Sequence, residues 1–218
     1  MKNIMLAIET FGTSPFAMII SLGAVYFDPA KQGTDAIKSE FYVTIQPEAS
    51  EKIGARMDAS TICRWLDPAR SAAYAEWLNT AHFEPDAAFH GFQQWLLGLF
   101  DINQYADAHD DIDLPADPAK RETFEPLSKI VMWGNGPAFD NEIVRNNYKM
   151  LGMDPPWKHW NDRDFRTMKN LTMGEQTGGT KAKDLAPPHE GHQHNALIDA
   201  RQQAMWLCNI VQQFSLTI

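Results

Sequence analysis

The sequence is poor in cysteine and has no long apolar run. Its 218 residues include two cysteines, Cys63 and Cys208, which are too few for a disulfide framework and lack the spacing of paired metal ligands. No apolar run approaches the ~20 residues that span a bilayer, and no charged segment leads into an apolar one at the start. We therefore expect a soluble protein of the reducing cytoplasm.

The sequence also lacks an excess of basic residues. Its net charge is -9 and its pI is about 5.2, which argues against a broad basic surface that grips nucleic acid by counterion release. An acidic cleft that collects divalent cations would instead present those cations to a phosphate, so a nucleic-acid enzyme stays compatible with this charge. With 44% hydrophobic residues, residues 1–218 suit one compact domain.

Alternating and helical apolar patterns predict an α/β fold. Strands are expected at 4–10, 18–27 and 41–45, and the turn residues between the last two favour an antiparallel meander. Apolar residues at helical spacing predict helices within 58–77 and 85–100, the first interrupted at Pro68.

The stretch 101–117 holds six aspartates and little apolar periodicity. Such a composition is typical of a solvated loop, and we expect a loop excursion over 101–127. A cation or partner site in this stretch is the less favoured alternative.

The first strand ends in a carboxylate. Ile4, Leu6 and Ile8 form an apolar face, while Glu9 lies on the other face, together with position 7. Taken alone, this pattern more often marks the end of a buried strand than a functional site.

A second acid follows a short apolar strand at 130–132. The strand leads into Gly134, Asn135 and Gly136, and Asp140 then falls in the first turn of a predicted helix. From the residues alone, helix capping is the favoured role of Asp140, since an anion also stabilises the positive end of the helix dipole.

The third informative stretch leads into the last helix. Asn195 is a suitable N-cap, and His194, Ala196 and Asp199 stand in a His-x-Ala-x-x-Asp arrangement. A zinc site is the alternative here, since His189, His192 and His194 with Glu190 are competent ligands, although no fourth ligand has a suitable spacing.

Together these stretches resemble the three motifs of the DEDDh (DnaQ-like) 3′-to-5′ exonuclease superfamily. Residues 7–10 are similar to its Asp-x-Glu-Thr motif, 133–141 to its second motif, and 194–199 to its histidine-bearing third motif. Within the superfamily the chain resembles the phage and prophage exoribonuclease-like group (exodeoxyribonuclease-VIII-like, DexA-type). Residues 9–15, 62–65, 133–141 and 160–167 carry that likeness.

The resemblance implies a ribonuclease-H-like three-layer fold, with an antiparallel meander followed by parallel strands in one mixed sheet between helices. It also implies two-metal hydrolysis of phosphodiesters with two Mg²⁺ or Mn²⁺ ions, hard cations that favour oxygen ligands. Glu9 and Asp199 would hold one ion and Asp140 would support the second. His194 would accept the proton of the attacking water, a role that suits an imidazole because its ordinary pKa lies near about 6.5.

The partner implied by the resemblance is the 3′ end of single-stranded DNA or RNA, in the host cytoplasm if the protein is phage-encoded. Thr10 and Phe11 are expected to seat the terminal nucleotide, with Asn135 and, more weakly, Trp65 as further substrate-binding candidates. The sequence leaves open a homodimer and the choice between DNA and RNA.

One position departs from the family pattern. Ala7 stands where the first motif has an aspartate, so the carboxylate that would bridge both metal ions is missing. We expect an exonuclease inactivated by this residue, whether introduced or natural. The alternative is a pseudo-nuclease that binds nucleic acid or nucleotides without cutting; retention of Glu9, Asp140, His194 and Asp199 argues against it.

Overall fold

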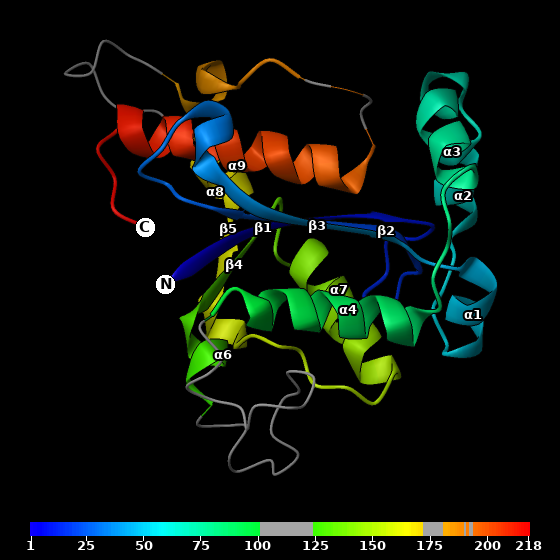
Figure 1. Cartoon of the computed structure of the whole chain (residues 1–218). Coiled ribbons are helices and arrows are strands. Elements are labelled where there is room, and N and C mark those ends of the chain that lie inside the picture. Colours follow the sequence, from blue (N-terminus) through cyan, green and yellow to red (C-terminus); the bar gives the residue numbers. More distant parts are fainter. Residues whose placement is uncertain (101–123, 172–180, 190, 192–193) are drawn as a thin grey trace.

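A computed structural model describes residues 1–100, 124–171, 181–189, 191 and 194–218. The described chain is built on one five-stranded sheet with the order β3-β2-β1-β4-β5 (Figure 1). Its strands are β1 (Lys2–Thr10), β2 (Ile19–Phe27), β3 (Ile37–Thr44), β4 (Ile130–Gly134) and β5 (Asp162–Asp164).

Strand directions confirm the predicted mixed sheet. β1 pairs antiparallel with β2, and β2 pairs antiparallel with β3. β4 pairs parallel with β1, and β5 pairs parallel with β4. β1 is therefore the central strand. Its C-terminal end, with Glu9, lies in the middle of the sheet and not at either edge strand.

Helices cover both faces of the sheet and one of its ends. The α-helices are α1 (Pro47–Lys52), α2 (Ala59–Trp65), α3 (Ser71–Leu78), α4 (Pro85–Gly98), α6 (Glu125–Lys129), α7 (Asp140–Met150), α8 (Phe165–Lys169) and α9 (Ala196–Gln213). Short 3₁₀ turns are η1 (Gly33–Ala36), η2 (Pro68–Arg70), η4 (His159–Asn161) and η6 (Ala182–Leu185).

Figure 1 shows α8 and α9 on one face of the sheet and α4, α6 and α7 on the other, with α1, α2 and α3 beyond one end. The expected three layers are thus confirmed. None of the helices in the described ranges is long and apolar enough to cross a membrane.

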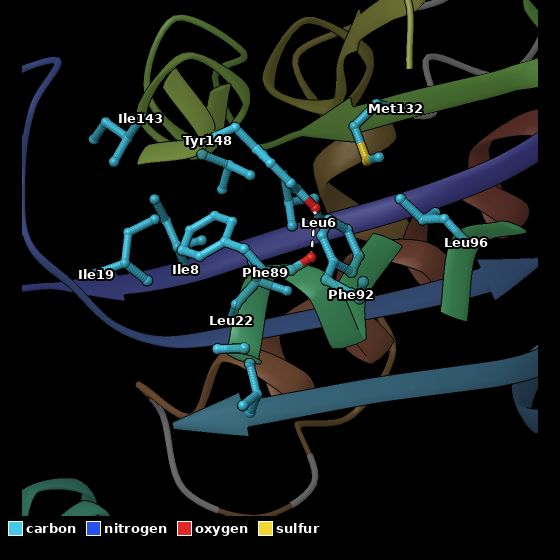
Figure 2. Packing of buried hydrophobic residues seen from close by; sticks show 14 of the residues in the cluster. Leu6, Ile8, Ile19, Leu22, Phe89, Phe92, Leu96, Met132, Ile143 and Tyr148 are labelled. Atoms are coloured by element: carbon cyan, nitrogen blue, oxygen red, sulfur yellow. Dashed lines mark hydrogen bonds between the residues drawn. The ribbon is translucent and has the colours of Figure 1, made fainter. Parts of the chain in front are cut away.

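The period-two pattern of β1 separates two cores. Ile4, Leu6 and Ile8 pack with residues of α4 and α7 on one face, where the Tyr148 hydroxyl donates to the Phe89 carbonyl over 3.0 Å (Figure 2). Met5, Ala7 and the buried residues of α9 form the core of the other face. The face that carries Glu9 is therefore the face that α9 covers.

Two predictions about local structure have different outcomes. The interruption at Pro68 is confirmed, because α2 ends at Trp65 and η2 begins at Pro68. Most of the predicted excursion 101–127 lies outside the described residues, but its last part is not a loop. Glu125–Lys129 forms α6, in which Pro126 lies in the first turn and Leu127 is buried, so a favourable N-terminal proline and an apolar contact outweigh the polar context.

Candidate active site

The end of β1 carries Glu9 and position 7 on the same face. Ala7 is buried at 6% exposure and belongs to the apolar core under α9. The Glu9 side chain is mostly buried, at 14% exposure. Positions 7 and 9 of the first motif therefore lie on the face of the sheet that α9 covers.

Gly23 allows α9 to approach the sheet closely. It lies opposite Ala7 in the β1–β2 register, and a Cβ at this position would come within 2.3 Å of the Ala196 carbonyl carbon and the Leu197 nitrogen. Real Cβ atoms do not tolerate such distances, so only glycine fits here without a shift of the helix. This contact places the first turn of α9 directly over β2, next to Ala7 of β1.

The close approach brings three of the predicted residues together. One ligand atom from each of Glu9, His194 and Asp199 lies within 4.8 Å of the others. His194 Nδ1 lies 3.7 Å from Glu9 Oε1. Residues separated by more than 180 positions thus form one cluster of two carboxylates and an imidazole.

The entry into α9 fixes His194. His194 has a φ of +69°, a left-handed conformation that is uncommon for a residue with a side chain and is often found at functional sites. The Asn195 side chain accepts hydrogen bonds from the amides of Leu197 and Ile198, which confirms the predicted N-cap. Its amide nitrogen also donates to Glu76 Oε1 of α3 over 2.7 Å.

The surroundings of Asp199 disfavour the charged form of its carboxyl group. Burial, followed by the nearby Glu9 charge, raises its pKa to about 6, while His194 and His189 oppose the rise. His189 Nε2 lies 3.8 Å from Asp199 Oδ1. A divalent cation would relieve both causes of the raised pKa by placing positive charge between the acids.

Asp140 stands outside this three-residue cluster. It is 6% exposed, and burial raises its pKa to about 7, although the backbone amides of Ile8 and Asn135 hydrogen-bond its carboxylate and lower the pKa. The contact with the Ile8 amide places Asp140 beside the β1 segment between positions 7 and 9. The third predicted acid is thus next to the three-residue cluster, on the side of the loop after β4.

Thr10, Phe11 and Trp65 form a buried support at the end of β1. The Trp65 indole donates to the Thr10 carbonyl over 2.9 Å, and Trp65 is only 4% exposed. Its ring meets the His194 ring edge-on, with 6.3 Å between centroids. Trp65 therefore holds the strand end and His194, and offers little free face for stacking on a base.

The charged run 162–166 forms the salt-bridged edge of the sheet, where Arg163 and Arg166 are exposed, but its side chains also hold neighbouring elements. Asp162 accepts from the Asn141 amide over 3.0 Å and from Arg145 over 2.7 Å. Arg166 donates to the Asn135 carbonyl over 2.6 Å. β5 and α8 thus anchor the loop and helix that carry Asn135 and Asp140.

Three residues of the site were not found from the sequence. Gly23 is a glycine within an apolar strand run that gives no local sign of a close helix contact, Glu76 is an ordinary acid in a helix, and the sequence suggests His189 only as a zinc ligand. Among the described residues, the group competent to hold a metal includes His194 but not His189. Glu190 and His192, the other proposed zinc ligands, lie outside the described residues.

The donor set fits a hard divalent cation in part. Glu9 and Asp199 offer carboxylate oxygens within ligand distance of each other, the chemistry that Mg²⁺ and Mn²⁺ prefer. Ala7 contributes no ligand on the same face. The site therefore suits one ion at Glu9 and Asp199 better than it suits a bridged pair.

Comparison with known proteins decides the family. The family model described as the 3'-5' exoribonuclease Rv2179c-like domain matches residues 2–211. The chain belongs to this family. It is accordingly a domain of the DEDDh 3′-to-5′ exonuclease superfamily, as its three motifs predict. No curated protein matches the chain.

Solved structures support the fold of this Rv2179c-like domain. The nuclease domain of 3'hExo, a DEDDh family member bound to rAMP, is 12% identical over 97% of this chain and 92% of its own, with a TM-score of 0.54. Cell-death related nuclease 4 is 15% identical, with a TM-score of 0.54, and this chain spans 64% of it. A zinc-bound E. coli ExoI–ssDNA complex is 13% identical, with a TM-score of 0.50 and 40% of its length spanned.

Proposed function

We propose that this domain is a metal-dependent 3′-to-5′ exonuclease that releases nucleoside monophosphates from single-stranded DNA or RNA, and that Ala7 leaves it almost inactive. The observation that carries the proposal is the convergence of Glu9, His194 and Asp199 on the face of β1 that also holds position 7. Asp140 beside the same strand completes the set except for the missing aspartate.

Metal ions would be held by Glu9 and Asp199, with Asp140 on the side of a second ion. When bound, such ions stabilise negative charge on the attacking and leaving oxygens of a phosphodiester. The carboxylates would keep the ions next to β1, and the burial of Glu9 and Asp140 excludes water that would weaken the electrostatic interaction.

His194 would accept the proton of the attacking water. Its Nδ1 lies 3.7 Å from Glu9 Oε1 and its side chain is 30% exposed, so a water molecule can reach it. The left-handed backbone and the Trp65 contact fix the ring, which a general base needs in order to meet one proton repeatedly.

The 3′-terminal nucleotide would lie against the end of β1. Thr10 and Phe11 form this end, and Trp65 supports it through the Thr10 carbonyl. We therefore propose a positioning role for Trp65 in place of direct stacking. Asn135 lines a pocket together with His194 and Asp199, and the rest of the strand would pass there.

The test is the dependence of hydrolysis on a free 3′ end, measured in an Ala7→Asp variant with 5′-labelled DNA and RNA strands. Mononucleotides should be released from the 3′ end, and a bulky 3′ blocking group should stop the reaction. Rapid cutting of a circular single strand would contradict an exonuclease.

A binding protein without nuclease activity is the second candidate, and Ala7 is the observation that favours it. Under this alternative, the Ala7→Asp variant would bind single strands but hydrolyse none of them. Binding of single strands by the Ala7 chain does not distinguish the nuclease from the binding protein, because a metal held by Glu9 and Asp199 would support binding in either case.

A further inference from the structure

A pocket adjoins the acidic cluster, and residues of α8, of α9 and of the loop after β4 line it. It has a volume of about 280 Å³, and His194 and Asp199 form one part of its wall while Asn135 and Lys169 form another. Lys169 ends α8, which follows β5 at the edge of the sheet. The pocket thus extends the site from β1 toward the β4 and β5 side.

Lys169 brings a positive charge to this pocket in a chain of net charge -9. Its Nζ lies 5.8 Å from the Phe165 ring centroid and 5.9 Å from that of Trp206, and these two rings hold the ammonium group in place. Within the described part of the chain, no carboxylate forms an ion pair with it.

A second cation lies nearby. Burial, followed by the Arg166 charge, lowers the pKa of Lys169, and the Asp164 charge only partly opposes this. Arg166 is held by the Asn135 carbonyl, so two cations stay close together at one end of an otherwise acidic site. An anion between the pocket wall and Lys169 would relieve their repulsion.

We propose that the pocket at Lys169 binds the backbone phosphate next to the scissile one, on the part of the strand that remains after cleavage. This rests on the proposed function, which places the terminal nucleotide at Thr10 and Phe11 and the scissile phosphate at the acids. A strand that passes from β1 over the acids reaches the β5 side next, where Lys169 lies. Lys169 is then a positioning residue that holds the substrate strand in register.

The test uses the Ala7 chain with Mg²⁺, Lys169→Gln, and Lys52→Gln as a matched control on α1, which lies apart from α8 (Figure 1). Binding of a single-stranded tetranucleotide and of a nucleoside 5′-monophosphate is measured over a range of salt concentrations. Lys169→Gln should weaken tetranucleotide binding about 5- to 10-fold and reduce its salt slope by roughly 0.7, the value for one lost phosphate contact.

The mononucleotide separates this subsite from the scissile position. The single phosphate of the mononucleotide would bind at the metal ion held by Glu9 and Asp199. The affinity of the mononucleotide should therefore not change in Lys169→Gln. Lys169→Arg should restore the tetranucleotide affinity and salt slope, because it keeps the charge. An unchanged tetranucleotide slope in Lys169→Gln, or an equal loss for both ligands, would overturn the proposal.

Hydrolysis by Ala7→Asp with Lys169 intact tests the proposed function separately. A Lys169-dependent salt slope without any hydrolysis would leave the phosphate subsite standing and refute the nuclease. Hydrolysis without a Lys169-dependent salt slope would support the nuclease and refute the phosphate subsite.

Discussion

His194 is the residue whose chemistry the site depends on most. In an Ala7→Asp background, His194→Ala should lower turnover roughly 10²- to 10⁴-fold, the range for loss of a general base. Glu9 and Asp199 remain, so metal affinity should change little. Single-turnover hydrolysis and a metal titration of the same variant measure the two effects.

His189→Ala is the matched control for this prediction. It removes another imidazole beside Asp199, 3.8 Å away, but leaves the ring that faces Glu9. Its effect on turnover should be smaller. Loss of activity in His189→Ala with normal activity in His194→Ala would show that the general base is misassigned.

Asp140 makes the stability of the metal-free protein depend on pH. Its pKa is raised to about 7 by burial, so between the ordinary pKa of about 3.9 and pH 7 the folded state holds a proton that the unfolded state has lost. The contribution of Asp140 therefore falls as pH rises through this window. At pH 8 the charged form opposes folding by up to about 4 kcal/mol.

Replacement of Asp140 by asparagine should remove this dependence. With chelator present, Asp140→Asn should be more stable relative to the parent at pH 8 than at pH 5, as measured by the free energy of unfolding in denaturant. Asp35→Asn, at an exposed acid in η1, corrects for the general effect of removing a charge. A difference that is the same at both pH values would count against a raised Asp140 pKa.

At the scale of elements, the contact between α9 and β2 decides where the third motif lies. Gly23→Ala would force a Cβ into the backbone of α9, so we expect a loss of roughly 1 to 3 kcal/mol in the free energy of unfolding. His194 and Asp199 should shift away from Glu9. In an Ala7→Asp background, hydrolysis should therefore fall by more than the loss of folded protein explains.

Gly98→Ala is the control, because this glycine lies at the end of α4 with nothing within 4 Å of an added Cβ. It should be neutral or slightly stabilising, since alanine is the better helix former. If Gly23→Ala were as harmless as Gly98→Ala, the close approach of α9 would not be what positions the site.

At the scale of the whole molecule, the sequence predicted the sheet well because its local periods are clear. The alternation along β1 and the N-cap at Asn195 are local signals, and the structure confirms both. Glu76 could not be found in this way, because its contact with Asn195 joins residues 119 positions apart. The role of Asp162 in β5 could not be found either, because Asn141 and Arg145 of α7 contact it across the fold and the periodicity of the sequence does not indicate such contacts.

Ala7 makes the complete site testable by a single substitution. The most direct measurement compares the chain as given with its Ala7→Asp variant on labelled single-stranded DNA and RNA, with Mg²⁺ or Mn²⁺ and with excess chelator. We expect little or no hydrolysis with Ala7, and metal-dependent release of mononucleotides with Asp at this position. An Ala7→Asp variant inactive on every substrate would contradict the nuclease proposal, and full activity with Ala7 would show that a bridging carboxylate at this position is not required.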